Sequence, residues 1–351
     1  MTRMDKVLIV RLGALGDILH ALPAQQLLHT RLPGASIDWL AKPHYIPLLR
    51  CVPGIRKAWP ANLRRWKSDS SKAPDVVRLI RSLRRERFDM VVDFQGLLKS
   101  AVLARIAGRG RVVGFKVERF KEKGTGWLYT HREEGESDLS QHVIDGNLRL
   151  IKRFVGGNNA TPLVPFEISR EDQEYVSRRL SDFKIRSPVL LNPGAGWVTK
   201  RWPASEYGRL ARMIVDHLGL PVAVTYGPGE EGLVEELRQQ AGVKNLVAFA
   251  TTITQLAALC RLSRLMVAGD SGPLHLAVST GTPVVAILGP TATTRNGPYS
   301  EADIVVKRDL PCSNSYKRVC NEFICMDIPA ETVLQAVQRR LELAAPGSPA
   351  S

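Results

Sequence analysis

Two glycine-containing loops in the second half of the chain carry residue types suited to binding a phosphate group. The first spans Asn192-Pro-Gly-Ala-Gly-Trp-Val-Thr-Lys200, and the second spans Gly269-Asp-Ser-Gly-Pro-Leu-His275. Each follows an apolar, β-prone run and precedes a predicted helix. Both loops are therefore expected at the carboxyl ends of strands, where backbone N–H groups and helix N-termini attract anions. Lys200 adds a positive charge and Ser271 a hydroxyl donor.

Several residues around these loops have both a functional and a structural interpretation. Glu231, after Tyr226-Gly-Pro-Gly, could accept hydrogen bonds from ribose hydroxyls or could be an ordinary acid in the first turn of a helix. Asp270 ends a predicted strand, where it could orient sugar hydroxyls, and the amides of Ser271 and Gly272 are expected to point toward an anion. His275 follows one helical turn later, either as a structural partner or as an aid to binding a diphosphate.

The first predicted strand is followed by the turn Arg11-Leu-Gly-Ala-Leu-Gly-Asp17. Gly13 and Gly16 allow a tight turn close to a ligand. Their spacing is not G-x-G-x-x-G, which disfavours a dinucleotide site. Asp17 stands where a helix is expected to begin, so it is either a capping residue or a carboxylate available as a general base.

Apolar strand-like runs alternate with amphipathic helical stretches, a pattern typical of parallel α/β sheets. In the first half the expected strands are 6–11, 36–41, 90–94 and 111–115, and the expected helices are 17–30, 75–87 and 97–107. In the second half the expected strands are 188–191, 222–225, 246–249, 265–268 and 283–288, and the expected helices are 170–181, 204–218, 231–240, 254–260, 273–280 and 330–343. A segment rich in breakers, 156–165, begins a linker. The pattern predicts two Rossmann-like domains, 1–165 and 166–351, as expected for 351 residues.

The net charge of +15 is concentrated in the first half. Residues 1–165 contain 29 Lys and Arg against 15 Asp and Glu, whereas residues 166–351 contain 20 against 19. This asymmetry indicates either an anionic partner for the first half or a solvated basic face.

The five cysteines do not form a pattern typical of disulfide-rich proteins. Cys51 and Cys260 are expected to be core thiols. Cys312, Cys320 and Cys325 could ligate zinc or an iron–sulfur cluster, but the spacing lacks a CxxC pair, which favours a structural interpretation. No apolar run reaches the roughly 18–20 residues needed to cross a bilayer. The N-terminal apolar run is interpreted as a buried strand of a cytoplasmic protein.

Six segments carry a resemblance to a known family. They are Gly13-Ala-Leu-Gly-Asp17, Arg64-Arg-Trp-Lys67, Asp93-Phe-Gln-Gly-Leu-Leu-Lys-Ser100, Lys200-Arg-Trp-Pro203, Tyr226-Gly227 and Asp270-Ser-Gly-Pro-Leu-His275. The chain resembles, over almost its whole length, the ADP-heptose:lipopolysaccharide heptosyltransferases, inverting enzymes with the GT-B fold. In that fold two Rossmann-like domains have parallel sheets that face a central cleft.

Different segments of the chain resemble different types of heptosyltransferase. The segments 64–67 and 95–100 look most like the enzyme that adds the first heptose. The cysteine segment and Pro193-Gly-Ala look more like the enzyme that adds the second, although Ser315 replaces a cysteine common in that group.

The resemblance implies a role for each matching residue. Asp17 would be the base that deprotonates an acceptor hydroxyl, and Lys200 would stabilise the departing diphosphate. The residues implied in binding the nucleotide sugar are Thr199, Lys200, Glu231 (ribose), Thr251 and Thr252 (adenine), Asp270 (heptose), Ser271, Gly272 and His275. Those implied in binding an anionic Kdo–lipid A acceptor are Gly13, Arg64, Arg65, Lys67, Gln95, Lys99 and Lys121. Acceptor binding in the first domain agrees with its excess of positive charge.

The resemblance also implies general properties. It implies no metal and no cofactor, because no DxD-like motif stands beside the phosphate loops. It implies a cytoplasmic protein in peripheral contact with the anionic inner membrane, and no nucleic-acid partner. It leaves open whether the last helix packs back on the first domain.

Two alternatives remain from the sequence. One is a GT-B transferase that uses another nucleotide sugar. The other is a nucleic-acid-binding protein that uses the basic first half. The second alternative leaves both phosphate loops without a role, and the chain has no basic motif interleaved with aromatic residues.

Overall fold

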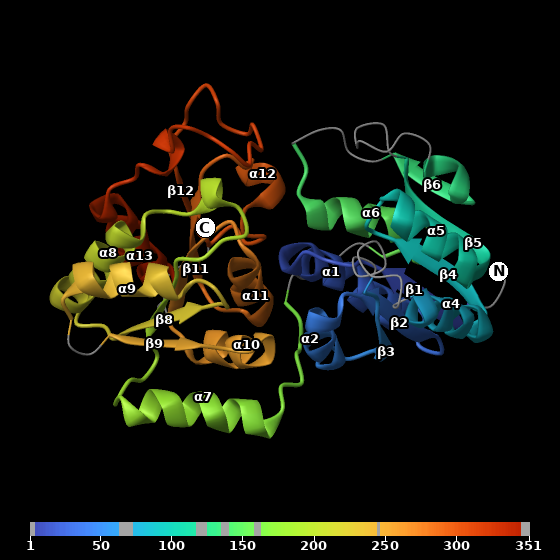
Figure 1. The fold of residues 1–351 in the computed structure, drawn as a ribbon, viewed down its shortest axis with the longest axis horizontal. Helices are drawn as coiled ribbons and strands as arrows, with labels where there is room; N and C mark the ends of the chain where they lie inside the picture. The colour runs from blue at the N-terminus through green and yellow to red at the C-terminus, as the bar shows by residue number, and fades with distance from the viewer. Residues whose placement is uncertain are drawn as a thin grey trace. The chain divides into compact units, whose positions relative to one another are not determined.

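The computed structural model describes residues 4–62, 73–116, 125–134, 140–157, 163–243 and 246–344. The chain forms two compact units, Met1–Glu167 and Ile168–Ser351. Each is a layered α/β structure with its own sheet (Figure 1). The boundary between the units lies two residues beyond the end of the domain predicted from the sequence.

The first unit contains six parallel strands in the order β3-β2-β1-β4-β5-β6. The strands are β1 (Lys6–Val10), β2 (Ser36–Ala41), β3 (Ile55–Pro60), β4 (Phe88–Asp93), β5 (Gly108–Lys116) and β6 (His131–Glu134). The helices are α1 (Leu15–Arg31), α2 (Ile46–Arg50), α4 (Ala73–Glu86), α5 (Leu98–Ala107) and α6 (Val143–Val155), with 3₁₀ turns η1 (Pro43–Tyr45) and η3 (Thr125–Leu128).

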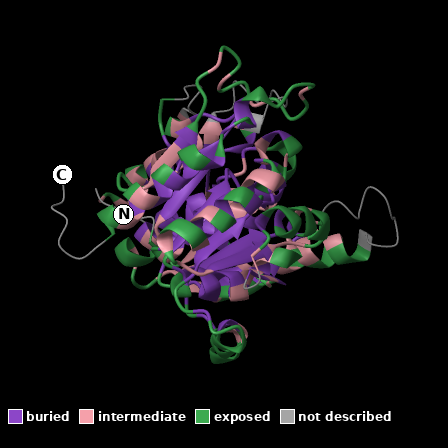
Figure 2. Cartoon of the chain, turned by 90° about the vertical axis from the view of Figure 1, so that its left-hand side faces the viewer, coloured by how far each residue is buried: buried purple, intermediate pink, exposed green. Residues whose placement is uncertain are grey.

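Helices cover both faces of this sheet. Helix α1 packs beside α6, and α4 packs beside α5. The central strand β1 is therefore covered on both sides, and its residues 7–10 have no exposed surface. Figure 2 shows the buried strands enclosed by helices whose outer faces are exposed. Burial on two faces explains why β1 is a continuous apolar run instead of an alternating one.

The second unit repeats the same architecture. Its strands are β7 (Val189–Asn192), β8 (Val222–Tyr226), β9 (Val247–Ala250), β10 (Leu265–Gly269), β11 (Val284–Leu288) and β12 (Ile304–Lys307). Its helices are α7 (Arg170–Asp182), α8 (Ala204–Leu218), α9 (Glu231–Ala241), α10 (Ile253–Leu262), α11 (Gly272–Thr280), α12 (Thr293–Asn296) and α13 (Ala330–Leu343), with 3₁₀ turns η4 (Val198–Lys200) and η5 (Ile324–Met326).

The second sheet has the order β12-β11-β10-β7-β8-β9, again all parallel. Counted from the first strand of each unit, this is the same order as in the first unit, and it is the strand order of Rossmann folds. Trp202, just before α8, and Tyr207, within α8, are buried in its hydrophobic core, with their rings edge to face at 4.7 Å. The last helix, α13, packs on α8 and on β10, β11 and β12 within this unit.

The structure corrects the prediction that the series of strands and helices in the first half ends with the strand 111–115. Residues 111–115 do not close the series, because β6 and α6 follow. The prediction also missed β3 and β12. All three missed strands are at or near sheet edges, where one side lacks a partner strand and polar residues are tolerated. Strand β6, His-Arg-Glu-Glu, contains no apolar residue.

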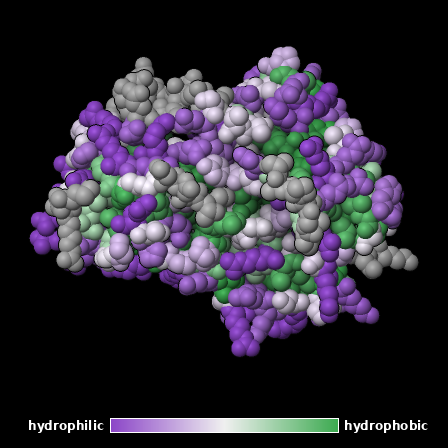
Figure 3. All heavy atoms as spheres, turned by 180° about the vertical axis from the view of Figure 1, so that it is seen from behind, coloured by the Kyte–Doolittle hydropathy of each residue, from purple (hydrophilic) through white to green (hydrophobic). Residues whose placement is uncertain are grey.

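Among the described residues, no helix combines the length and the apolar character needed to cross a membrane. Hydrophilic side chains cover much of the face shown in Figure 3, and hydrophobic ones lie in smaller groups between them.

Candidate active site

The two phosphate-type loops of the second unit lie side by side because β7 and β10 are neighbours in the sheet. Lys200, at the end of η4, extends to the second loop, and its Nζ lies 2.7 Å from Oδ2 of Asp270. The backbones also approach closely: a Cβ at Gly269 would lie 2.7 Å from the carbonyl oxygen of Lys200. Glycine at this position allows the loop after β7 to rest on the end of β10.

Asp270 is held as a carboxylate in a nearly buried position. Its side chain is 5% exposed, and Nε2 of His275 lies 3.3 Å from Oδ1. Burial alone raises the pKa of this carboxyl, but the hydrogen bond with His275 and the charge of Lys200 outweigh it, so the pKa lies well below its usual value. The Lys200–Asp270–His275 group therefore holds a buried carboxylate and its paired cation at the carboxyl edge of the sheet.

Ser271 provides a hydrogen-bonding group that has no partner in the described part of the chain. It is the residue before α11, yet its side chain makes no capping hydrogen bond. Its Oγ is buried and without a hydrogen-bond partner there. Buried hydroxyls are normally paired, so an unpaired one beside a helix N-terminus indicates a ligand site. Gly272 is the first residue of that helix.

The segment 311–324 contacts the loop that carries Lys200. The hydroxyl of Thr199 donates a hydrogen bond to the carbonyl oxygen of Lys317 at 2.9 Å. Nζ of Lys200 lies 4.3 Å, and the guanidinium carbon of Arg318 lies 4.6 Å, from the ring centroid of Trp197. Both cations therefore lie against one aromatic ring. Thr199 is buried and already paired, and Arg318 was missed by the sequence analysis.

The loop after β8 contains two acids with different orientations. Oε2 of Glu230 accepts a hydrogen bond from the amide of Gly227 at 2.8 Å. A Cβ at Gly194 would lie 2.1 Å from Oε1 of Glu230, so this carboxylate lies against the loop that follows β7. Glu231, the predicted ribose ligand, is the exposed first residue of α9. Glu231 stays the predicted residue, and the position of Glu230 makes it a second candidate that the sequence did not single out.

The predicted adenine-binding residues lie at the end of β9. The hydroxyls of Thr251 and Thr225 are 3.1 Å apart. Thr252 caps α10. Its Oγ1 accepts a hydrogen bond from the backbone amide of Gln255 at 3.2 Å, and the backbone amide of Thr252 donates one to Oε1 of Gln255 at 3.0 Å. The side chain and the amide of Thr252 are thus both committed to the helix, which leaves the carbonyl oxygens as the backbone groups available for the contact expected from the sequence.

In the first unit, Asp17 lies in the first turn of α1 directly after β1. Its Oδ1 lies 2.6 Å from Nη2 of Arg11, and its Oδ2 accepts a hydrogen bond from the amide of Ala14 at 2.9 Å. The side chain remains 40% exposed. A Cβ at Gly13, which has φ of 142°, would lie 2.6 Å from the ring of Tyr45. Asp17 is therefore both a capping residue and an accessible, oriented carboxylate.

Gln95 lies in the loop after β4, the neighbour of β1, and Lys99 lies in the helix α5 that follows this loop. Oε1 of Gln95 accepts a hydrogen bond from the amide of Leu12 at 3.0 Å, which ties this loop to the turn that contains Gly13. Lys99 is exposed in the first turn of α5. The carboxylate of Asp93 organises the loop, because it accepts hydrogen bonds from the amide of Gln95 and from the hydroxyl of Tyr129, each at 2.8 Å. Burial raises the pKa of Asp93.

Four predicted acceptor residues, Arg64, Arg65, Lys67 and Lys121, lie outside the described residues. All five cysteines are free thiols. Cys260 is buried, which raises the pKa of its thiol to about 12, whereas Cys51 is half-buried and only partly a core residue. Within the described ranges, no group of three His, Cys, Asp or Glu side chains is arranged to hold a metal ion.

Two Rossmann-like units of this kind are the architecture of the GT-B glycosyltransferases. Residues 76–324 match the profile of glycosyltransferase family 9 (heptosyltransferase), about 70% of the chain. The chain therefore belongs to glycosyltransferase family 9, the heptosyltransferases, and is an enzyme. Family membership decides against the nucleic-acid-binding alternative.

Known relatives agree with this assignment. The chain is 27% identical to lipopolysaccharide heptosyltransferase 1 of Pseudomonas aeruginosa over 320 residues, which are 90% of this chain and 87% of the relative. The structure of Escherichia coli heptosyltransferase WaaC with ADP superimposes with a TM-score of 0.76 at 21% identity, covering 95% of this chain and 99% of that one. WaaC with ADP-2-deoxy-2-fluoro heptose gives a TM-score of 0.73 at 21% identity, with 97% and 100% covered.

Proposed function

We propose that this enzyme transfers heptose from ADP-heptose to an anionic lipopolysaccharide precursor of the Kdo–lipid A type, with inversion at the anomeric carbon. The names of the relatives support the class of donor and acceptor. The observation that carries the proposal is the Lys200–Asp270–His275 group beside the unpaired hydroxyl of Ser271. This group combines a cation, a fixed anion and a free hydroxyl donor at the end of two adjacent strands.

The donor binds at the carboxyl edge of the second sheet. The diphosphate lies at the N-terminus of α11, where Ser271 donates its hydroxyl and the amide of Gly272 points at an anion. Lys200 moves from Asp270 to the diphosphate, while Thr199 holds the Lys200 loop in place. Asp270, released from Lys200 but still hydrogen-bonded to His275, accepts hydrogen bonds from the sugar hydroxyls.

The nucleoside lies across the loops after β8 and β9. The backbone at Thr251 and Thr252 contacts adenine. We assign the ribose contact to Glu230 in place of Glu231, because the carboxylate of Glu230 lies between the loops that follow β7 and β8. Glu231 remains the alternative, and the two residues are compared below.

The chemical step begins at Asp17. Its carboxylate takes the proton of the acceptor hydroxyl as that oxygen attacks the anomeric carbon of the donor. The bond between the anomeric carbon and the diphosphate oxygen breaks, and ADP leaves with the electron pair. Lys200 and the amides at the start of α11 stabilise the negative charge that develops on ADP. A single displacement of this kind inverts the anomeric configuration.

The acceptor is bound by the first unit. Gly13 and Gln95 belong to the turns after β1 and β4, and Lys99 lies in the first turn of α5. Further positive charge for the carboxylates and phosphates of the acceptor comes from Arg64, Arg65, Lys67 and Lys121. The 29 basic residues against 15 acidic ones in residues 1–165 support an anionic acceptor. An acceptor anchored in lipid requires the enzyme to work peripherally at the cytoplasmic face of the inner membrane.

The proposal is tested by incubating the purified enzyme with ADP-heptose and Kdo₂–lipid A. We expect one heptose to be added, with release of ADP, and nuclear magnetic resonance of the product to show the inverted anomeric configuration. UDP-glucose and GDP-mannose serve as competing donors. Transfer from either of these at a rate equal to that from ADP-heptose would assign the enzyme to another donor class.

Ser271→Ala is expected to weaken ADP binding while leaving thermal stability close to that of the wild type. The hydroxyl has no partner in the free enzyme, so its removal breaks no internal hydrogen bond. A hydrogen bond to a charged phosphate is worth about 1.5–3 kcal/mol, which corresponds to an increase in Kd of about tenfold or more. Calorimetric titration with ADP and a melting curve give the two measurements. Ser279→Ala, a buried serine further along α11, is the control.

Glu230→Gln is expected to raise the KM for the donor about tenfold, because a charged acceptor of the ribose hydroxyls is lost. Glu231→Gln should change this KM less than twofold, because its side chain is exposed at the start of α9. Both variants remove one negative charge from the same turn, so each controls for the other. A large effect confined to Glu231→Gln would return the ribose contact to Glu231.

A further inference from the structure

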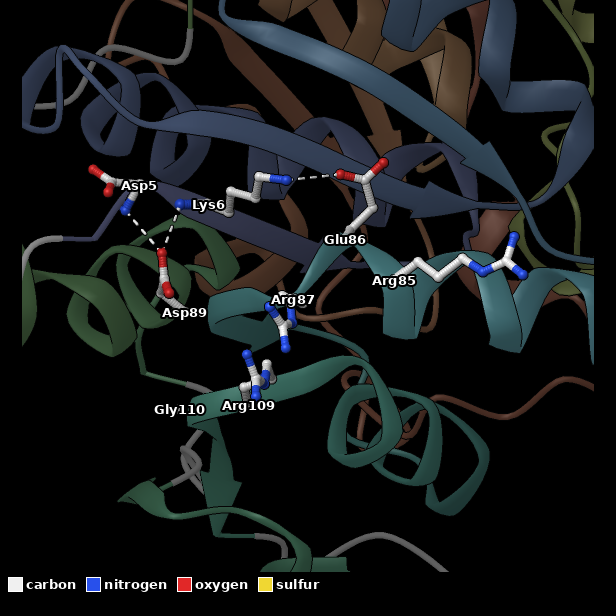
Figure 4. A pocket seen from close by; sticks show the side chains of 8 residues that line it. All are labelled: Asp5, Lys6, Arg85, Glu86, Arg87, Asp89, Arg109 and Gly110. Atoms are coloured by element: carbon white, nitrogen blue, oxygen red, sulfur yellow. Dashed lines mark hydrogen bonds and ion pairs between the residues drawn. The ribbon is translucent and has the colours of Figure 1, made fainter.

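A pocket of about 620 Å³ lies on the first unit at the amino ends of β1, β4 and β5 (Figure 4). The residues proposed to bind the acceptor, Gly13 and Gln95, follow the carboxyl ends of β1 and β4, at the opposite edge of the sheet. The pocket therefore has no role in the transfer reaction as proposed. Four of the residues that line it are basic: Lys6, Arg85, Arg87 and Arg109.

Arg87 enters the pocket from an unusual backbone conformation. It is the single residue between α4 and β4, and its φ is 60°, in the left-handed region. The position after a helix C-terminus commonly takes this conformation, but it is usually glycine, which has no side chain to clash with the backbone. Here arginine takes the place of glycine, and its side chain lines the pocket.

Arg109 is directed by a β-bulge. Along β4 and β5, Phe88 pairs with Gly108 and Met90 pairs with Arg111, so β5 contains one extra residue at this point. Gly110 fits the bulge because a Cβ there would lie 2.5 Å from the carbonyl oxygen of Asp89. Bulges redirect side chains, and this one brings the side chain of Arg109 to the pocket.

Two of the three carboxylates that line the pocket, those of Glu86 and Asp89, already have partners. Glu86 lies 3.2 Å from Nζ of Lys6 and 3.0 Å from Nη2 of Arg56. Oδ2 of Asp89 accepts hydrogen bonds from the amides of Asp5 and Lys6, at 2.9 and 3.0 Å.

The arginines of the pocket lack such partners. In the ranges that the structure describes, no ion pair is formed by Arg85, Arg87 or Arg109. Figure 4 shows the guanidinium groups of Arg87 and Arg109 pointing toward one another, with Arg85 extending away.

Two facing guanidinium groups repel one another unless an anion lies between them. Guanidinium groups bind phosphate oxygens through paired N–H···O bonds, which makes phosphate a better match than a simple halide. We propose that Arg87 and Arg109 form a second anion site that binds a phosphate monoester, either a soluble one or the headgroup of an anionic lipid. The site is independent of the donor site in the second unit.

The first test is calorimetric titration of the full-length enzyme with glycerol 1-phosphate. The variant Arg87→Gly/Arg109→Ala should bind it at least about tenfold more weakly than the wild type, since two charge-assisted contacts are lost. Arg87→Gly suits the left-handed backbone, and a melting curve of the double variant, compared with that of the wild type, shows whether it still folds. The control, Arg50→Ala, removes an exposed arginine from the same unit and should bind like the wild type.

The second test distinguishes the source of the phosphate. Each protein is sedimented with vesicles of phosphatidylcholine that contain about 20% phosphatidic acid, an anionic lipid. Pure phosphatidylcholine vesicles serve as the reference. Binding that the double variant loses identifies a lipid headgroup. A response to glycerol 1-phosphate without vesicle binding identifies a soluble ligand.

ADP affinity provides the independent readout. It should be the same in the double variant and the wild type, because the proposed nucleotide site lies in the second unit. If the double variant binds both glycerol 1-phosphate and the vesicles as well as the wild type does, the inferred site does not exist. The same conclusion follows if the wild type binds neither.

Discussion

Asp17→Ala is expected to lower the rate of heptose transfer about 10²–10⁴-fold, the usual contribution of a general base, while ADP binding stays within twofold of the wild type. The physical reason is that the proton of the acceptor hydroxyl then has no base to receive it. The measurements are single-turnover transfer from ADP-heptose and calorimetric titration with ADP. Because Asp17 is in the first unit and the proposed donor residues are in the second, the variant should lose transfer activity but keep its affinity for ADP.

The matched control for this prediction is Asp172→Ala. Asp172 is the third residue of α7, as Asp17 is the third residue of α1, so both changes remove an acid from the first turn of a helix, although only Asp17 also pairs with Arg11. Asp172→Ala should retain full transfer activity. Asp17→Asn, which keeps an acceptor for the amide of Ala14 but cannot take a proton, should be as inactive as Asp17→Ala. Transfer at the wild-type rate in Asp17→Asn would mean that another group is the base.

Lys200→Ala is expected to have two separable effects. The first is on transfer, which should fall about 10²–10³-fold, since an electrostatic contact to the leaving group is lost. The second is on stability. The side chain of Asp270 is 5% exposed, and without Lys200 its buried charge keeps, among the residues that the structure describes, only His275 as a partner. Removing one partner of a buried ion pair lowers the free energy of unfolding by about 3–5 kcal/mol. We expect a loss at the lower end of this range because His275 remains a partner of Asp270.

A double variant distinguishes the two effects. In Lys200→Ala/Asp270→Asn the buried side chain is neutral, so chemical denaturation should show most of the lost stability restored, whereas transfer should remain low. The control is Lys307→Ala, which breaks a surface pair with Asp309 whose carboxylate is 82% exposed. Such pairs contribute about 1 kcal/mol or less. If the double variant regains transfer together with stability, Lys200 acts only as a structural residue.

The domain pattern and the two phosphate-type loops could be predicted from the sequence. Apolar strands in a parallel sheet are buried on both faces, and this leaves a local signal, as in residues 7–10 and 265–268. The edge strand β6 left no such signal, because a strand with one open side need not be apolar.

Fewer of the contacts in the candidate site could be predicted from the sequence. The loops after β7 and β10 could be recognised individually, but Arg318 could not, since its contact with Trp197 depends on how the segment 311–324 folds back. The choice between Glu230 and Glu231 likewise depends on one turn of backbone before α9.

By itself, then, the sequence determined the alternation of strands and helices, the repetition of one architecture in two units, and the residue types at the loop ends, because these depend on neighbours within a few positions. Tertiary structure alone decided which groups meet. Lys200 contacts Asp270, 70 residues away, because β7 and β10 pair in the sheet. Arg87 and Arg109 line one pocket because a left-handed residue and a β-bulge direct them there. Such contacts arise from strand order and backbone geometry, which no local pattern of residues specifies.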